Sequence, residues 1–110
     1  MSAGPAAALA AGALPITFSD VRDAEARLRP HLAPTPLRHY DQLDELVGQG
    51  IRVHVKHENH QPTQSFKIRN GLNAILGRTV EQRGRGLIGA STGNHGQGVA
   101  YGGRLTGTPL

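Results

Sequence analysis

The sequence predicts an α/β fold in which parallel strands are joined by crossover helices and the sheet is incomplete. One observation is the strict alternation of apolar and polar residues over 51–56, which is typical of a half-buried strand. Another is the order of the later segments: an apolar helical pattern from Lys67, a short apolar run at 87–90 and a glycine-rich helical pattern at 97–105. Strand, helix, strand and helix in this order favour a parallel sheet with a right-handed crossover.

The chain before residue 51 alternates helical and extended segments. Thr17 and Asp20 have the spacing of a capping box, and apolar residues follow at helical spacing. Residues 34–37 are expected to be extended, because two prolines remove amide donors there. A short helix is expected at 41–47, with Gly48 as a left-handed cap. The apolar side chains that this helix is expected to bury are Leu43, Leu46 and Val47.

Residues 57–66 are polar and contain a proline, so they cannot continue the strand, and a helical pattern then runs to about Arg78. Lys67 therefore lies in the first turn of a helix. The positive dipole end of a helix disfavours a further positive charge and so favours a neutral amine. A neutral lysine is what Schiff-base chemistry with an aldehyde cofactor requires. The alternative is an ordinary solvated lysine on the surface.

Residues 90–98 form a loop of small residues between the second predicted strand and the last helix. Glycines let the backbone approach a ligand, and the amides of 91–95 at the helix entry can hydrogen-bond a carboxylate. The alternative is a strand-to-helix turn that binds nothing. The helix itself contains Gly98, Gly102 and Gly103, each of which costs up to about 1 kcal/mol relative to alanine, so it is expected to be weak by itself.

Both motifs resemble those of one enzyme family. The run Pro62-Thr63-Gln64-Ser65-Phe66-Lys67-Ile68-Arg69-Asn70 is similar to the lysine motif of the threonine and serine dehydratases, pyridoxal-phosphate enzymes of the tryptophan-synthase-β type, fold type II. The run Ala90-Ser91-Thr92-Gly93-Asn94-His95-Gly96-Gln97-Gly98 is similar to their substrate loop. The family usually has glycine where this chain has Gln64, in a loop that favours positive φ.

The resemblance implies a cofactor, pyridoxal 5'-phosphate, bound covalently by the catalytic Lys67. It places Phe66 and Asn94 beside the cofactor. The residues that it assigns to the amino-acid substrate are Ser91, Thr92, Gly93 and His95. The implied reaction is a β-elimination of L-threonine or L-serine to a 2-oxo acid and ammonia, in which freed Lys67 removes the α-proton.

Within the family, Thr92 leaves serine racemase, hydroxyectoine-pathway dehydratase and threonine synthase open, because this position often carries serine in the racemases and alanine in the dehydratases. The resemblance covers residues 16–110 and implies the N-terminal part of a catalytic domain, after a flexible tail at 1–15. The groups that hold the cofactor phosphate and pyridine nitrogen in the family are expected downstream. We therefore expect these 110 residues alone to be inactive and not to fold cooperatively, and a full-length relative to form a homo-oligomer. The alternative is a non-catalytic binding module.

Composition excludes several classes of function. The net charge is +4, but ten of the twelve basic residues are arginines scattered along the chain, without the basic stripe and aromatic platforms of a nucleic-acid-binding surface. There is no cysteine, which excludes disulfides and thiolate metal sites. No apolar run has the length of a membrane span, so we expect a soluble, cytoplasmic protein without nucleic-acid or membrane partners.

Two further patterns are set aside. Residues 84–89 match the glycine pattern of a dinucleotide fold, but they precede a strand and open no helix. His54, His57 and His60 recur at every third residue, yet strand geometry directs the first away from the others, so no metal site is expected.

Overall fold

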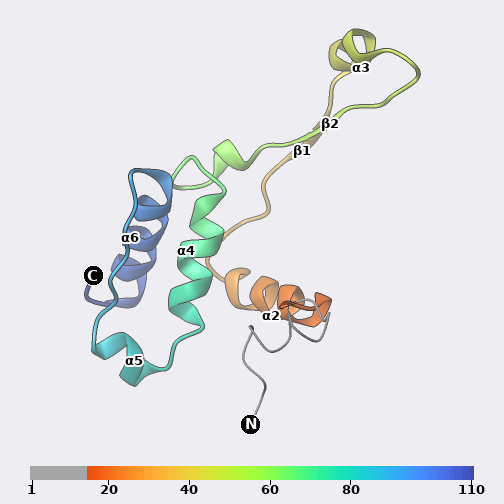
Figure 1. Ribbon diagram of the computed structural model, residues 1–110. Coiled ribbons are helices and arrows are strands. Elements are labelled where there is room, and N and C mark those ends of the chain that lie inside the picture. Colours follow the sequence, from red (N-terminus) through yellow and green to blue (C-terminus); the bar gives the residue numbers. More distant parts are fainter. Residues whose placement is uncertain (1–14) are drawn as a thin grey trace.

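The computed structural model describes residues 15–110, so the predicted tail at 1–15 lies, except for Pro15, outside the described residues. The elements in chain order are α2 (Phe18–Leu28), β1 (Leu37–His39), α3 (Asp41–Val47), β2 (His54–Lys56), the short 3₁₀ helix η1 (Glu58–His60), α4 (Lys67–Leu76), α5 (Val80–Gly84) and α6 (Asn94–Thr106). Helix α4 lies alongside α6 and also contacts α2, and the two strands carry α3 away from them (Figure 1). The radius of gyration is 17.8 Å, whereas a compact chain of this length has about 13 Å. The molecule is therefore elongated.

Helix α2 begins with the predicted capping box. The Thr17 hydroxyl accepts a hydrogen bond from the Asp20 amide at 3.3 Å, and the Asp20 carboxylate accepts one from the Thr17 amide at 2.6 Å. The helix ends at Leu28, because Pro30 cannot continue the hydrogen-bonding pattern.

The α/β class and the incomplete sheet are confirmed, but the predicted parallel pair of 51–56 with 87–90 does not form among the described residues. Strands β1 and β2 are antiparallel, with Leu37 opposite Lys56 and His39 opposite His54. The connection of residues 40–53 contains α3 and a turn that reverse the direction of the chain, so β2 returns beside β1 in the opposite sense. Within the described residues, the predicted strand at 87–90 pairs with no other strand, and only the Leu87 amide reaches a backbone acceptor, the Pro109 carbonyl at 2.9 Å.

Helix α3 has the predicted bounds, and Gly48 follows it with a φ of 71°. Its predicted burial is wrong, because the Leu46 side chain is 81% exposed and no described element packs against that face. The predicted strand over 51–56 is also shorter, and Ile51 is half exposed. Hydrophobic periodicity located these elements, but burial requires a neighbour.

The core forms where α4 packs between α2 and α6 (Figure 1). The buried apolar side chains are Leu28, Leu32, Ile68, Leu72 and Ile75. The helix α4 ends at Leu76, two residues earlier than predicted. The glycines expected to weaken α6 are buried against its neighbours: Gly98 faces Ile68, and Gly102 faces Leu72. They let the helices approach closely, so packing offsets their unfavourable helix propensity. No helix in the part of the chain that the structure describes is both long and apolar enough to cross a membrane.

Candidate active site

Both predicted motifs lie at the same end of a parallel helix pair. The helix α4 begins at Lys67 and α6 begins at Asn94. Their contacts advance together along the two helices, from Lys67 against Gly98 to Leu72 against Gly102, so the two N-termini are neighbours (Figure 1). Two positive dipole ends side by side favour an anionic ligand.

The ε-amine of Lys67 has no polar partner in the part of the chain that the structure describes. Within residues 15–110, it takes part in no hydrogen bond or ion pair, and it lies 5.8 Å from the ring centroid of Phe66. The Lys67 backbone amide is held by the Ser65 hydroxyl at 3.3 Å, and Ser65 is itself buried. The backbone is thus anchored, while the half-buried side chain keeps its amine available for chemistry.

The first turn of α6 presents backbone amides that no side chain among residues 15–110 caps. Its N-cap, Gly93, has no side chain, and no other side chain among residues 15–110 caps this helix. The Ser91 hydroxyl accepts a hydrogen bond from the Gly93 amide at 3.1 Å and so closes the loop. Ser91, Thr92, Gly93 and Asn94 are exposed, and His95 is half-buried. An anion can therefore reach the first turn of α6.

A groove of about 300 Å³ runs beside this loop, and among the predicted site residues it includes Ser91 and His95. Its remaining lining is apolar or glycine: Leu87, Ile88, Gly89, Gly96, Val99, Ala100 and Leu110. Lys67, Phe66, Thr92, Gly93 and Asn94 do not line it. The structure places Lys67 and the loop at one end of the helix pair, but it does not bring all the predicted residues into one cavity.

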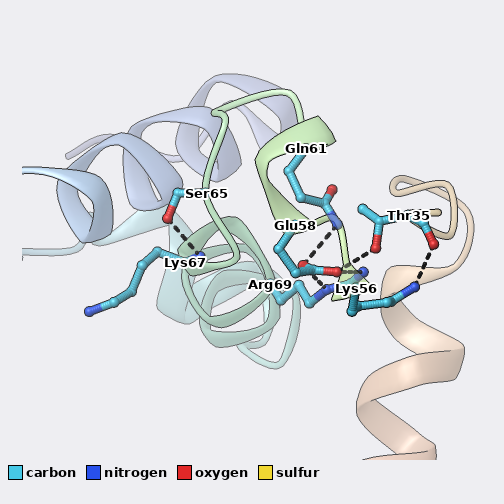
Figure 2. Close-up of polar contacts among 7 residues, drawn as sticks. All are labelled: Thr35, Lys56, Glu58, Gln61, Ser65, Lys67 and Arg69. Carbon is cyan, nitrogen blue, oxygen red and sulfur yellow. Dashed lines mark hydrogen bonds and ion pairs between the residues drawn. The ribbon is translucent and has the colours of Figure 1, made fainter. Parts of the chain in front are cut away.

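Sequence reasoning missed a hydrogen-bonded cluster around Glu58 (Figure 2). Arg69 binds its carboxylate in bidentate fashion, with distances of 2.7 Å and 2.9 Å. The Thr35 hydroxyl donates to the same carboxylate at 2.5 Å, and the Gln61 side-chain amide donates to it at 3.2 Å. The Arg69 hydrogen bonds, aided by those from Thr35 and Gln61, lower the pKa of Glu58 from 4.5 to about 2. The sequence feature that could have indicated this cluster is the lone carboxylate Glu58 in the polar stretch before Lys67, together with Arg69, two residues after Lys67.

The cluster and the lysine amine lie on different sides of α4. Figure 2 shows the Lys67 side chain directed away from Glu58 and Arg69. Two residues along a helix correspond to a rotation of about 200°, so Arg69 holds the first turn from the face opposite to Lys67.

Gln64 has a φ of 55°, so the residue that replaces the family's glycine does occupy a left-handed conformation. Its amide closes the turn to the Gln61 carbonyl at 2.7 Å. This conformation costs a residue with a side chain about 1–2 kcal/mol.

Among the described residues, the histidines at positions 54, 57 and 60 do not form a group of metal ligands. His57 is hydrogen-bonded to the Tyr40 hydroxyl at 2.7 Å, and no group with His54 and His60 comes within ligand distance in residues 15–110. The cluster that does is His39, at the end of β1, with Asp41 and Asp44 of α3, and His39 Nε2 lies 2.7 Å from the Asp44 carboxylate. Hydrogen bonding of one imidazole to carboxylates accounts for this arrangement.

Comparison with known proteins gives concordant matches. The family model described as pyridoxal-phosphate dependent enzyme matches residues 28–110. The biosynthetic L-threonine dehydratase of Corynebacterium glutamicum is 43% identical over 93 residues, covering 84% of this chain and 21% of that protein. Maize serine racemase is similar with a TM-score of 0.78 and 34% identity, over 84% of this chain and 28% of the racemase. For the threonine deaminase of T.th. the TM-score is 0.75 and the identity 36%, over 86% and 32% of the two chains. The chain thus spans between about a fifth and a third of these relatives.

Proposed function

Since the chain belongs to the family of pyridoxal-phosphate-dependent enzymes, we propose that it serves β-elimination of a hydroxy amino acid, with Lys67 as the residue that binds the cofactor. The substrates that we propose are L-threonine and L-serine, and the products are a 2-oxo acid and ammonia. The observation that carries the proposal is the ε-amine of Lys67, which has no polar partner among residues 15–110, at the same end of the helix pair as the start of α6, which no side chain of those residues caps. Similarity to a threonine dehydratase and a threonine deaminase supports the choice of reaction.

The residues fit the cofactor's reactive group. A primary amine is the group that condenses with an aldehyde, and the Lys67 amine has no competing carboxylate among residues 15–110. When bound, pyridoxal phosphate supplies an electron sink for charge at the substrate's α-carbon. Once the substrate amine has displaced it from the cofactor, the Lys67 amine is proposed to accept the α-proton at Nζ.

The loop before α6 is proposed to bind the substrate carboxylate. The exposed residues Ser91, Thr92 and Gly93 and the half-buried His95 lie at the start of α6, whose first turn no side chain among residues 15–110 caps. Asn94 is proposed to orient the cofactor ring, with Phe66 beside the lysine. The positive dipole end of α6 favours the carboxylate in the ground state and the transition state alike.

A second candidate function is amino-acid racemisation. The specific observation that favours it is the TM-score of 0.78 with a serine racemase. Both reactions begin with removal of the α-proton, so they share Lys67 and differ in whether the β-hydroxyl leaves.

The test uses the two lysines of the chain. The protein, expressed from its own gene, is mixed with pyridoxal phosphate, reduced with borohydride, digested and analysed by mass spectrometry. We expect the added mass on the peptide with Lys67, its loss in Lys67→Ala and its retention in Lys56→Ala, because the Lys56 amine is already bound to the Thr35 carbonyl at 2.6 Å. Labelling that depends on Lys56 would contradict the assignment. Assays with L-threonine and L-serine for 2-oxo acid, and for D-serine, then separate elimination from racemisation.

A further inference from the structure

The segment that leads into Lys67 has little regular structure to hold it. Between η1 and α4 it is closed by turns. The Gln61 backbone N–H donates to the Glu58 carbonyl at 3.2 Å, and the Gln64 backbone N–H donates to the Gln61 carbonyl at 2.7 Å. It also contains the left-handed Gln64. A strained conformation persists only where the surroundings determine it, so other contacts must hold this segment.

The start of α4 lacks the usual local cap. Its N-cap, Phe66, offers no side-chain oxygen, and the local side-chain contact is the long hydrogen bond from the Lys67 amide to Ser65. The exact turn at which the helix begins decides where the Lys67 side chain points, because each residue rotates the helix by about 100°. A contact that fixes this turn therefore also fixes the lysine.

Glu58 and Arg69 provide such a contact. Both carboxylate oxygens of Glu58 are used, one by Thr35 and an Arg69 terminal nitrogen and the other by Gln61 and Arg69 Nε. The carboxylate thus joins the extended segment before β1, the turn after η1 and the first turn of α4 (Figure 2). The Glu58 side chain is 22% exposed, so water and salt screen the pair less than a surface pair.

We propose that Glu58 and Arg69 are positioning residues for Lys67, whose bidentate pair sets the turn at which α4 begins and thereby aims the lysine amine. The pair acts from the opposite face of the helix and leaves the amine unengaged. The proposal rests on the proposed function for the role of Lys67, while the fixing of the turn is a property of the chain alone.

The test compares three variants of the protein expressed from its own gene. Glu58→Gln removes the charge and keeps the shape, and Arg69→Lys keeps the charge but loses the bidentate geometry. Glu25→Gln is the matched control, because it breaks the exposed pair of Glu25 and Arg29, at 2.6 Å on α2. Amide hydrogen exchange is measured without cofactor, and the rate of cofactor attachment at Lys67 is measured separately.

We expect exchange at residues 64–68 to rise about tenfold in Glu58→Gln and less in Arg69→Lys, with α6 unchanged and with Glu25→Gln like the unsubstituted protein. Attachment at Lys67 should slow by a similar factor. Three exchange results would overturn the inference. The amide exchange rate at 64–68 could stay unchanged in Glu58→Gln, or it could rise equally over α2, α4 and α6. The third is that the amides of 64–68 show no protection from exchange in the unsubstituted protein. If exchange rises locally but attachment keeps its rate, the pair has only a structural role and the inference also fails. If the unsubstituted protein attaches no cofactor at Lys67, the proposed function fails, whereas the exchange data still decide whether the pair fixes the turn.

Discussion

Gly98 lies so close to Lys67 that a methyl group at position 98 would stand 2.8 Å from the Lys67 carbonyl oxygen. It would also lie 3.0 Å from the Ile68 Cα. Both neighbours are backbone atoms in the first turn of α4, so they cannot move aside without moving the helix. The absence of a side chain at position 98 therefore sets the distance between the lysine and the loop before α6.

We predict that Gly98→Ala lowers the free energy of unfolding by about 1–3 kcal/mol, because overpacking must push α6 away from α4. Denaturant titration measures this change, and attachment of the cofactor at Lys67 should slow. Gly84→Ala in α5 is the control, since open space surrounds that position and alanine favours the helix by up to about 1 kcal/mol. Equal effects of the two substitutions would contradict the prediction.

Glu58 makes the protein sensitive to acid. Its pKa falls from 4.5 to about 2 in the folded chain, so the unfolded state binds the proton more readily. The stabilisation is fully present above about pH 4.5 and is lost as the pH falls toward 2; we put it on the order of 1–3 kcal/mol. The difference in unfolding free energy between the unsubstituted protein and Glu58→Gln should therefore shrink over this window. A difference that stays constant from pH 6 to 2 would speak against the ion pair.

Gln64 occupies a conformation that glycine adopts without a steric penalty. We predict that Gln64→Gly raises the free energy of unfolding by about 0.5–1 kcal/mol, after the greater entropy of glycine in the unfolded chain is subtracted. Gln49→Gly is the matched control, because Gln49 has a φ of 56° in the turn after α3, far from the lysine along the hairpin. Thermal unfolding should show a gain in both variants, and only Gln64→Gly should change cofactor attachment. A loss of stability in both would show that these left-handed residues carry no strain.

Ser91 is proposed to bind the substrate carboxylate equally in the ground state and the transition state. On that basis Ser91→Ala should raise KM several-fold and lower kcat less. Ser91→Thr keeps the hydroxyl that accepts the Gly93 amide and is the control for the shape of the loop. Steady-state kinetics with L-threonine and L-serine measure both constants. A change confined to kcat would place Ser91 in the chemical step instead.

Residues 1–110 expressed by themselves should unfold without a sharp transition, with or without pyridoxal phosphate. The sheet has two strands of three residues, and large apolar side chains such as Leu46 and Ile88 are exposed. The small core offers little to offset an ordering cost of about 1–2 kcal/mol per residue. Circular dichroism against temperature is the measurement. A cooperative transition that the cofactor moves upward would support an independent binding module.

Features that depend on neighbouring residues were predictable from the sequence. The capping box of Thr17 and Asp20 and the start of α4 at Lys67 depend on groups within a few residues of one another, whereas α6 begins at Asn94, three residues before the predicted helix at 97–105. The bounds of α3 likewise depend on nearby groups. Short-range sterics and hydrogen bonding determine such features, and they are nearly independent of the rest of the fold.

The tertiary structure alone decided which distant groups meet. Thr35, Glu58 and Arg69 converge across 23 and 11 residues of chain, and no periodicity encodes that meeting. It also decided that β1 and β2 pair antiparallel, that Leu46 stays exposed among residues 15–110 and that Gly98 faces Lys67. The physical reason is that burial, strand pairing and close helix contact are properties of two surfaces, whereas a sequence pattern describes only one of them.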